Sequence, residues 1–290
     1  MISVDCDSVS DYLATYNYSF SPPPSDPTYT EGLPRLLDIL DKHRVRGTFF
    51  LVGRETQKRT HRAIIQRIAE SGHEIANHTM NHPPNFGALP REVKIQEIEN
   101  MARAAEDITG QKVVGFRAPV YWIDRVTMDL LEERGYLYDS SIYPSFFFPL
   151  QQAIIRWKAW NKRSKIQWGN ALWNFSPKGP FRPHERYIWL KGNRNIIEIP
   201  ISVVPFLNLP FYGTFVLFSG TLYFRVGLGL IRRFTKQMVF QYHPIELLGL
   251  EDGVDPRLNR LPGLKKGAKE KMEMIDSCVG LMAHHFDLRP

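Results

Sequence analysis

The chain has 290 residues, of which 43% are hydrophobic and 23% are charged, a balance typical of a globular protein with a substantial core. Its net charge of +7 favours an anionic partner, either a phosphate-bearing substrate or an acidic membrane surface. Nucleic acid is disfavoured as a partner, because no recognisable nucleic-acid-binding motif accompanies the charge. The two cysteines, Cys6 and Cys278, are too few for a disulfide framework, and we predict that both are small buried hydrophobes.

The chain opens with a short apolar stretch typical of a β-strand. Side chains alternate between the faces of an extended strand, so Ser3, Asp5 and Asp7 share one face. Two carboxylates on one face repel each other and must be partly desolvated by what packs around them. This pattern leaves two interpretations open, a strand end running into a solvated loop or a metal or acid–base site.

The following segments alternate between strand and helix patterns. After a Pro/Ser-rich loop at residues 19–30, helical spacing begins behind Thr30, the predicted cap, in the first of five predicted helices. Predicted helices span residues 30–47, 61–72, 90–110, 124–135 and 269–286, and predicted strands span residues 1–7, 48–53, 73–78, 112–119, 136–141, 195–202 and 236–243. This alternation predicts a parallel sheet covered by helices. We expect a single domain over residues 1–290, an α/β fold with an incomplete, distorted (β/α) barrel of seven strands.

The regular pattern breaks at residues 145–191, which we interpret as an irregular insertion. This segment is rich in aromatic and basic residues, and residues 146–163 resemble a short basic amphipathic helix. Two interpretations remain open, additional core packing and an interfacial surface that touches anionic lipid.

A second unusual segment, residues 203–224, carries no charge and approaches the length of a membrane span. Pro205, Pro210, Gly213 and Gly220 interrupt it, so we expect strands or apolar loops rather than a spanning helix. The N-terminus lacks a basic region followed by an apolar run, so we expect no signal peptide. The sequence therefore predicts a cytoplasmic location, with peripheral association at the inner membrane face as an extension of it.

Polar residues gather at the predicted strand ends, where (β/α) barrels place their functional groups. They are Asp5, Asp7, His78, Arg117, Asp139 and His243. One of these residues, His78, forms a pair with His82, which lies four residues later. Two imidazoles and one carboxylate form a metal site that leaves coordination positions open. The pair alone is a weak signal, but the preceding D-x-D strand makes a metal the favoured interpretation.

These motifs, in this order, resemble those of the polysaccharide deacetylase superfamily, metal-dependent carbohydrate esterases with a NodB-like domain. The resemblance runs from Asp5 to His243. It implies that Asp5, in VDCD, is the general base and that Asp7 is a metal ligand. The HTMNH segment is similar to the family's H-[ST]-x-x-H motif, which implies that His78 and His82 are the other two ligands.

The later motifs imply supporting roles. RAP is similar to the family's R-x-P motif, so Arg117 would orient and tune Asp5. Asp139, in YDSS, would brace Arg117, and His243, in QYHP, would be the general acid. The chain has D-x-D where most members have adjacent aspartates, which resembles a subset that includes deformylases of lipid-linked aminosugars. The tryptophan often found in the fourth motif is absent here.

The resemblance implies a metal-dependent hydrolase that removes an acetyl or formyl group from an aminosugar in a glycan or a lipid-linked saccharide. The expected cofactor is one divalent ion, with zinc favoured over cobalt, manganese, nickel and iron. A metal lowers the pKa of water, a carboxylate can accept the proton, and a protonated imidazole can give one to the departing amine. Two alternatives remain, an amidohydrolase of small non-sugar amides and a catalytically silent sugar- or lipid-binding module.

Overall fold

The computed structural model describes residues 1–21, 25–147, 171–235, 237–259, 264 and 266–290. Its main sheet has seven parallel strands in the order β6-β5-β4-β3-β2-β1-β9. These strands are β1 (Ile2–Asp5), β2 (Gly47–Leu51), β3 (Glu74–Asn77), β4 (Gly115–Phe116), β5 (Tyr138–Asp139), β6 (Ile197–Glu198) and β9 (Phe240–Tyr242). The first and last predicted strands are therefore neighbours, and the predicted incomplete barrel of seven strands is confirmed.

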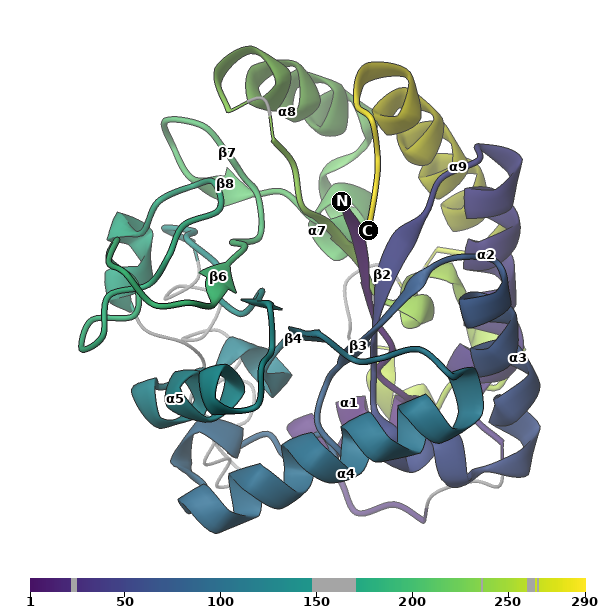
Figure 1. Ribbon diagram of the computed structural model, residues 1–290. Coiled ribbons are helices and arrows are strands. Elements are labelled where there is room, and N and C mark those ends of the chain that lie inside the picture. The colour runs from purple at the N-terminus through teal and green to yellow at the C-terminus, as the bar shows by residue number, and fades with distance from the viewer. Residues whose placement is uncertain (22–24, 148–170, 236, 260–263, 265) are drawn as a thin grey trace.

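Helices surround the curled sheet (Figure 1). They are α1 (Val9–Thr15), α2 (Leu33–Lys42), α3 (Arg59–Glu70), α4 (Arg91–Thr109), α5 (Arg125–Glu133), α7 (Gly213–Ser219), α8 (Thr221–Phe234) and α9 (Ala268–His285). Contacts link neighbours around the outside in the order α5, α4, α3, α2, α9 and α8. Single helical turns occur at Thr28–Gly32, Gly53–Gln57, Phe86–Ala88, Pro119–Tyr121, Ala171–Phe175, Pro244–Leu247, Leu250–Asp252 and Pro256–Leu258.

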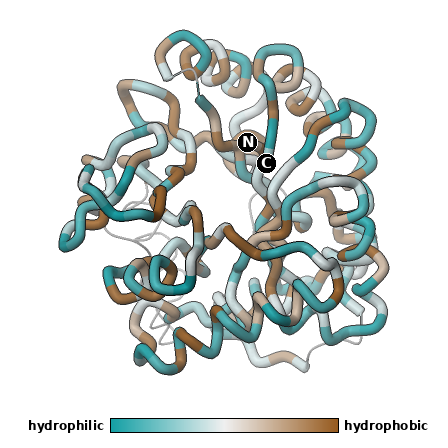
Figure 2. Tube along the Cα trace, viewed as in Figure 1, coloured by the Kyte–Doolittle hydropathy of each residue, from teal (hydrophilic) through white to brown (hydrophobic). Residues whose placement is uncertain are grey.

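The core lies on both faces of the central strands. Every residue of β1 and β2 is buried, as expected where helices cover one face of a parallel sheet and barrel side chains fill the other. Hydrophobic and hydrophilic residues alternate along the helices in Figure 2, as expected where one face of each helix packs on the sheet. Cys6 and Cys278 are free and buried, as predicted.

The five predicted helices are present, but the cap predicted at Thr30 is wrong. Helix α2 begins at Leu33 and continues from the helical turn Thr28–Gly32, so Thr30 lies inside a helical segment. Part of the predicted loop at residues 19–30, residues 148–170 of the predicted insertion at 145–191 and most of the amphipathic segment at residues 146–163 lie outside the described residues. Helix α1 was not predicted, because its seven residues lack a clear apolar repeat.

The apolar segment at residues 203–224 combines a hairpin with two helices. Strands β7 (Val203–Val204) and β8 (Leu209–Pro210) pair antiparallel, which confirms the strand prediction for the first half. The second half is helical, contrary to prediction, because Gly220 (φ +89°) ends α7 and lets α8 begin instead of preventing helix formation. Within the described residues, no helix is both long and apolar enough to cross a bilayer.

Phe240 joins the sheet to the α7–α8 unit, so its removal tests how that unit is held. Its ring lies 5.1 Å from that of Phe211 and 5.7 Å from that of Phe224, centroid to centroid. We expect Phe240→Ala to lower the free energy of unfolding by about 3–5 kcal/mol through the cavity it leaves. Phe218→Ala, at a ring that is 74% exposed, is the matched control and should change it by less than about 0.5 kcal/mol. Urea denaturation measures both, and equal losses would contradict this packing role.

Candidate metal and acid–base site

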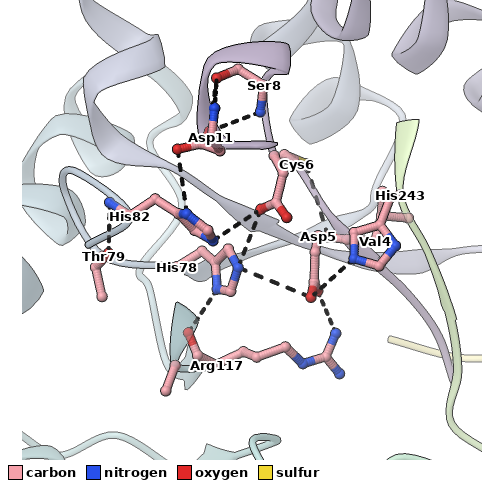
Figure 3. A network of polar contacts seen from close by, with 12 residues as sticks. Val4, Asp5, Cys6, Ser8, Asp11, His78, Thr79, His82, Arg117 and His243 are labelled. Carbon is pink, nitrogen blue, oxygen red and sulfur yellow. Dashed lines mark hydrogen bonds and ion pairs between the residues drawn. The ribbon is translucent and has the colours of Figure 1, made fainter. Parts of the chain in front are cut away.

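The site lies where the parallel strands end, and it brings together side chains distant in sequence (Figure 3). Asp5 is the last residue of β1, His78 follows β3, Arg117 follows β4 and His243 follows β9. Because parallel strands share one carboxyl edge, the order of β4, β3, β2, β1 and β9 in the sheet places these groups around one point.

Asp7, His78 and His82 form a compact buried cluster. Asp7 Oδ1 lies 3.4 Å from Nε2 of both His78 and His82, and one ligand atom from each residue falls within 4.8 Å of the others. Asp7 Oδ1 is buried and accepts no hydrogen bond, an arrangement that costs free energy unless a cation is bound. The residues present therefore fit a divalent ion with one oxygen and two nitrogen ligands.

The outer nitrogens of both imidazoles have protein partners. His78 Nδ1 lies 2.7 Å from the backbone carbonyl of Arg117, to which it can donate a hydrogen bond. His82 Nδ1 lies 3.3 Å from Asp11 Oδ1, and Asp11 also pairs with Arg54. Partners of this kind fix the ring orientation and leave Nε2 free to ligate, so both Nε2 atoms face Asp7.

The loop that carries the two histidines has an unusual backbone. Thr79 (φ 65°) and His82 (φ 49°) both adopt left-handed conformations, which are uncommon for residues other than glycine. Asn77 Oδ1 accepts a hydrogen bond from the Thr79 amide, and Thr79 Oγ1 accepts one from the His82 amide. These bonds hold the strained turn that returns His82 to the side of His78.

The charges of the cluster favour a bound cation. Burial would raise the pKa of Asp7, but His82 and His78 together hold it well below its usual range. Burial would lower the pKa of His78, but the contact with Asp7 and the charge of Asp5 raise it. His82 has a lowered pKa, with burial the main cause, so it favours the neutral form that ligates a metal.

Asp5 lies between this cluster and His243. Arg117 donates a hydrogen bond to Asp5 Oδ1 and Gln241 Nε2 donates one to Asp5 Oδ2. Asp5 Oδ2 is also 4.0 Å from His78 Nε2 and 3.9 Å from His243 Nε2. Each carboxylate oxygen has two lone pairs, so Asp5 Oδ2 can still accept a proton from a group placed between the two imidazoles.

The structure corrects the expected link between Arg117 and Asp139. The five N–H donors of Arg117 bond to Asp5, to the Ser3 hydroxyl and to the backbone oxygen and hydroxyl of Ser140. None remains for Asp139, because consecutive residues of a strand face opposite sides and Ser140 takes the place beside the guanidinium. Asp139 therefore acts on Arg117 through charge, and Ser140 supplies the hydrogen bonds.

Asp139 instead pairs with Glu198, a residue that sequence reasoning did not select. Both are fully buried, and Asp139 accepts hydrogen bonds from the amide and hydroxyl of Ser141. Burial raises the pKa of Asp139, and burial together with the Asp139 charge raises that of Glu198 well above its usual range. The raised pKa values favour a proton on this pair, because two buried carboxylates in contact repel each other when both are ionised.

His243 is held by a second buried carboxylate. Its Nδ1 lies 3.2 Å from Glu246 Oε1, which also accepts a hydrogen bond from the Thr214 hydroxyl. Burial would lower the pKa of His243, but the bond to Glu246 and its charge raise it to about 9. The imidazole is therefore protonated at neutral pH, with Nδ1 directed to Glu246 and Nε2 directed toward Asp5.

Sequence reasoning missed three supporting residues, Asp11, Gln241 and Glu246. Glu246 follows His243 by three residues within a helical turn, and Gln241 precedes it by two on the same strand face, so spacing could have indicated both. Asp11 could be connected to the site only through the unpredicted helix α1, where it forms a capping box with Ser8. His73, which we left out as a core histidine, is buried and accepts a hydrogen bond from the Gly47 amide.

The family model for polysaccharide deacetylase matches residues 24–138. A peptidoglycan deacetylase-like protein of Gibberella zeae is 35% identical over 151 residues, covering 49% of this chain and 43% of that protein. A chitooligosaccharide deacetylase of Sinorhizobium fredii is 35% identical over 126 residues, covering 40% of this chain and 56% of the relative. The chain thus spans about half the length of these relatives.

A solved structure from Mycobacterium smegmatis, assigned to the polysaccharide deacetylases, superposes over 100% of this chain and 92% of its own. Its TM-score is 0.57 at 22% sequence identity, a likeness of fold. The fold and the strand-end cluster define a class of incomplete (β/α) barrels with their site at the carboxyl ends of the strands. Together with the match over residues 24–138, they make the chain similar to the polysaccharide deacetylases in fold and in the first part of its sequence.

The cluster predicts stoichiometric metal binding. We expect about one divalent transition ion per chain in the wild type, and none retained by the double variant His78→Ala/His82→Ala, because binding needs both imidazoles. Elemental mass spectrometry of the purified proteins measures this. His73→Ala, which removes a buried histidine outside the cluster, is the matched control and should keep the ion. A wild type that stays metal-free after zinc or cobalt is supplied would contradict the prediction.

Proposed function

We propose that this protein is a metal-dependent hydrolase that removes an N-acyl group from an aminosugar. The observation that carries the proposal is the position of Asp5 Oδ2, about midway between a ligand imidazole and a protonated imidazole, at 4.0 Å and 3.9 Å. The names of relatives, peptidoglycan deacetylase-like protein and chitooligosaccharide deacetylase, support an N-acetylated aminosugar. A formyl group remains the alternative that the D-x-D spacing favours.

The proposed ligands are Asp7, His78 and His82, and zinc is the favoured ion. A divalent ion at this site supplies an acidified water and positive charge near the acyl oxygen. Asp5 accepts the proton that the attacking water loses, and Arg117 and Gln241 hold its carboxylate in place. Asp139 is proposed to act on Arg117 less directly, through its charge, while its chain neighbour Ser140 supplies the hydrogen bonds.

His243 completes the proton balance. Its imidazolium, maintained by Glu246, donates a proton to the nitrogen that leaves when the amide C–N bond breaks. The water oxygen becomes part of the released carboxylic acid, and the sugar keeps a free amine. Transfer of the proton held by Asp5 to His243, directly or through solvent, then returns both groups to their initial protonation states.

The favoured form of the substrate is a saccharide carried on a lipid. Apolar side chains in the described parts of the predicted insertion are exposed, with Phe175 73% and Phe146 50% accessible. Aromatic faces stack on sugar rings and also suit a membrane interface. A lipid-linked aminosugar would use both properties, and a polymeric glycan would use only the first.

Substitution of the proposed base tests the mechanism. We expect Asp5→Asn to keep the metal and to lower kcat by roughly 10²–10⁴-fold, the usual contribution of a general base. Release of acetate or formate from a set of N-acylated aminosugars measures activity, and elemental analysis of the same sample measures the ion. Because the variant leaves the buried Arg117 charge without its partner, thermal denaturation verifies that it is folded. Full activity in a folded Asp5→Asn variant would exclude this base, and an inactive wild type would favour a silent binding module.

The acid is tested by a pH profile. Activity that needs protonated His243 falls as the pH rises through the pKa of this residue, which Glu246 raises to about 9. Removing the negative charge in Glu246→Gln should lower that pKa, so the basic limb should move toward neutral pH by about one unit or more. Glu273→Gln, on the exposed face of α9, is the matched control and should leave the profile unchanged. If the basic limbs of the wild type and Glu246→Gln were identical, His243 held by Glu246 would not be the acid.

A further inference from the structure

The tip of the β7–β8 hairpin exposes apolar side chains where loops are usually polar. Phe206 is 71% exposed and Leu207 is 65% exposed, between two strands of only two residues each. Phe206 adopts a left-handed backbone conformation (φ 71°), which is unfavourable for a bulky residue. The backbone is therefore strained in a way that presents an apolar tip to the exterior.

Helix α8 continues this apolar surface. Leu222 (75% exposed) and Val226 (56% exposed) lie four residues apart and so occupy one face, which Phe218 at the end of α7 extends. The ring of Phe206 lies 4.8 Å from that of Phe234, which joins the hairpin tip to the end of α8. Figure 1 shows the hairpin beside α8 at the edge of the molecule. We call these six residues, with the arginines described next, the α7–α8 face.

The segment that forms this surface carries charges of one sign. Residues 203–235 contain no aspartate or glutamate, and three exposed arginines, Arg225, Arg232 and Arg233, lie on α8. Arg225 and Arg232 are seven residues apart, so they line one flank of the apolar stripe, while Arg233 follows Val226 along it. An exposed apolar stripe with flanking cations is the pattern of a helix that lies in a membrane interface.

A series of aromatic rings connects this surface to the candidate site. Neighbouring ring centroids are 6.5 Å apart for Phe218 and Phe215, 6.4 Å for Phe215 and Tyr212, 5.8 Å for Tyr212 and Tyr143, and 5.9 Å for Tyr143 and Tyr121. The Tyr121 hydroxyl then donates a hydrogen bond to Gln241, which bonds to Asp5. A continuous series of side-chain contacts therefore links the surface to the site.

We propose that the α7–α8 face docks on an anionic lipid bilayer, with its apolar side chains among the acyl chains and its arginines at the headgroups. The proposal deepens the proposed function, on which its value for substrate access rests. A second copy of the chain fits this face less well. In a two-fold dimer the same patch meets itself, so the arginines of one copy would face those of the other.

Vesicle flotation with the full chain tests the docking surface. We expect the wild type to float with vesicles of phosphatidylcholine and phosphatidylglycerol, and to bind pure phosphatidylcholine vesicles weakly. Leu222→Glu/Val226→Glu should reduce the partition coefficient at least tenfold, and Arg225→Ala/Arg232→Ala should reduce it by about 25-fold, roughly fivefold for each charge. At high salt, which screens the charges, the difference in vesicle binding between the arginine variant and the wild type should be smaller.

Two matched controls isolate the surface from general effects. Leu137→Glu changes a leucine that is 61% exposed outside this face, and Arg103→Ala removes an exposed arginine on α4; both should bind as the wild type does. Equal binding by the α7–α8 variants and the wild type would overturn the proposal, as would no binding at all. A concentration-dependent dimer that Leu222→Glu/Val226→Glu abolishes, seen by analytical ultracentrifugation without vesicle binding, would assign the face to a second copy instead.

Activity on a soluble N-acetylated aminosugar, measured without vesicles, separates the two proposals. The α7–α8 variants should keep this activity, because none of the four substituted residues contacts the candidate site. Vesicle binding in a protein without hydrolase activity would leave the docking surface standing and overturn the enzymatic proposal. Hydrolysis without vesicle binding would do the reverse.

Discussion

The buried ion pair between Arg117 and Asp5 is the interaction on which the site depends. The Arg117 guanidinium is fully buried, 4.1 Å above the ring of Phe50, and bonds to residues of β1 and to Ser140 after β5. Removing one partner of such a pair typically costs 3–5 kcal/mol, because the other charge stays buried and uncompensated. The bonds from Arg117 thus tie β1 to the end of β5, across the sheet from β4. The sheet must curl to satisfy all five N–H donors, and this curvature brings the strand ends together.

Around that pair, two carboxylate–imidazole systems have opposite electrostatic character. On one side Asp7 remains ionised and His82 favours the neutral form, which suits a cation. On the other side Glu246 keeps His243 protonated, which suits proton donation. Asp5 lies between them, so a base and an acid can act on the same bond from different directions. Environments that push the pKa values of neighbouring titratable groups apart in this way are typical of acid–base sites.

The sequence predicted the barrel, because hydrophobic periodicity locates strands. Parallel strands align their ends, and the structure brings together five of the six candidate side chains, Asp5, Asp7, His78, Arg117 and His243. It could not predict partners that depend on irregular backbone or on which strands pair. Asp11 depends on a short helix without a strong periodic signal, and Glu198, although it lies in a predicted strand, meets Asp139 only because β6 pairs with β5. Asp139 was assigned to Arg117 from its place in a motif, whereas strand alternation turns it toward Glu198 and gives Ser140 that contact.

Helix α7 relates the acid side of the site to the exterior. At its first residue, Gly213, an added Cβ would lie 1.9 Å from Glu246 Oε2, and the next residue, Thr214, bonds to the same carboxylate. Five residues beyond Gly213, Phe218 is exposed on the α7–α8 face. A helix this short moves as one body, so anything that anchors Phe218 also restrains the groups that hold Glu246 against His243. The face proposed to dock and the group proposed to donate a proton therefore share a structural element, the single helix α7.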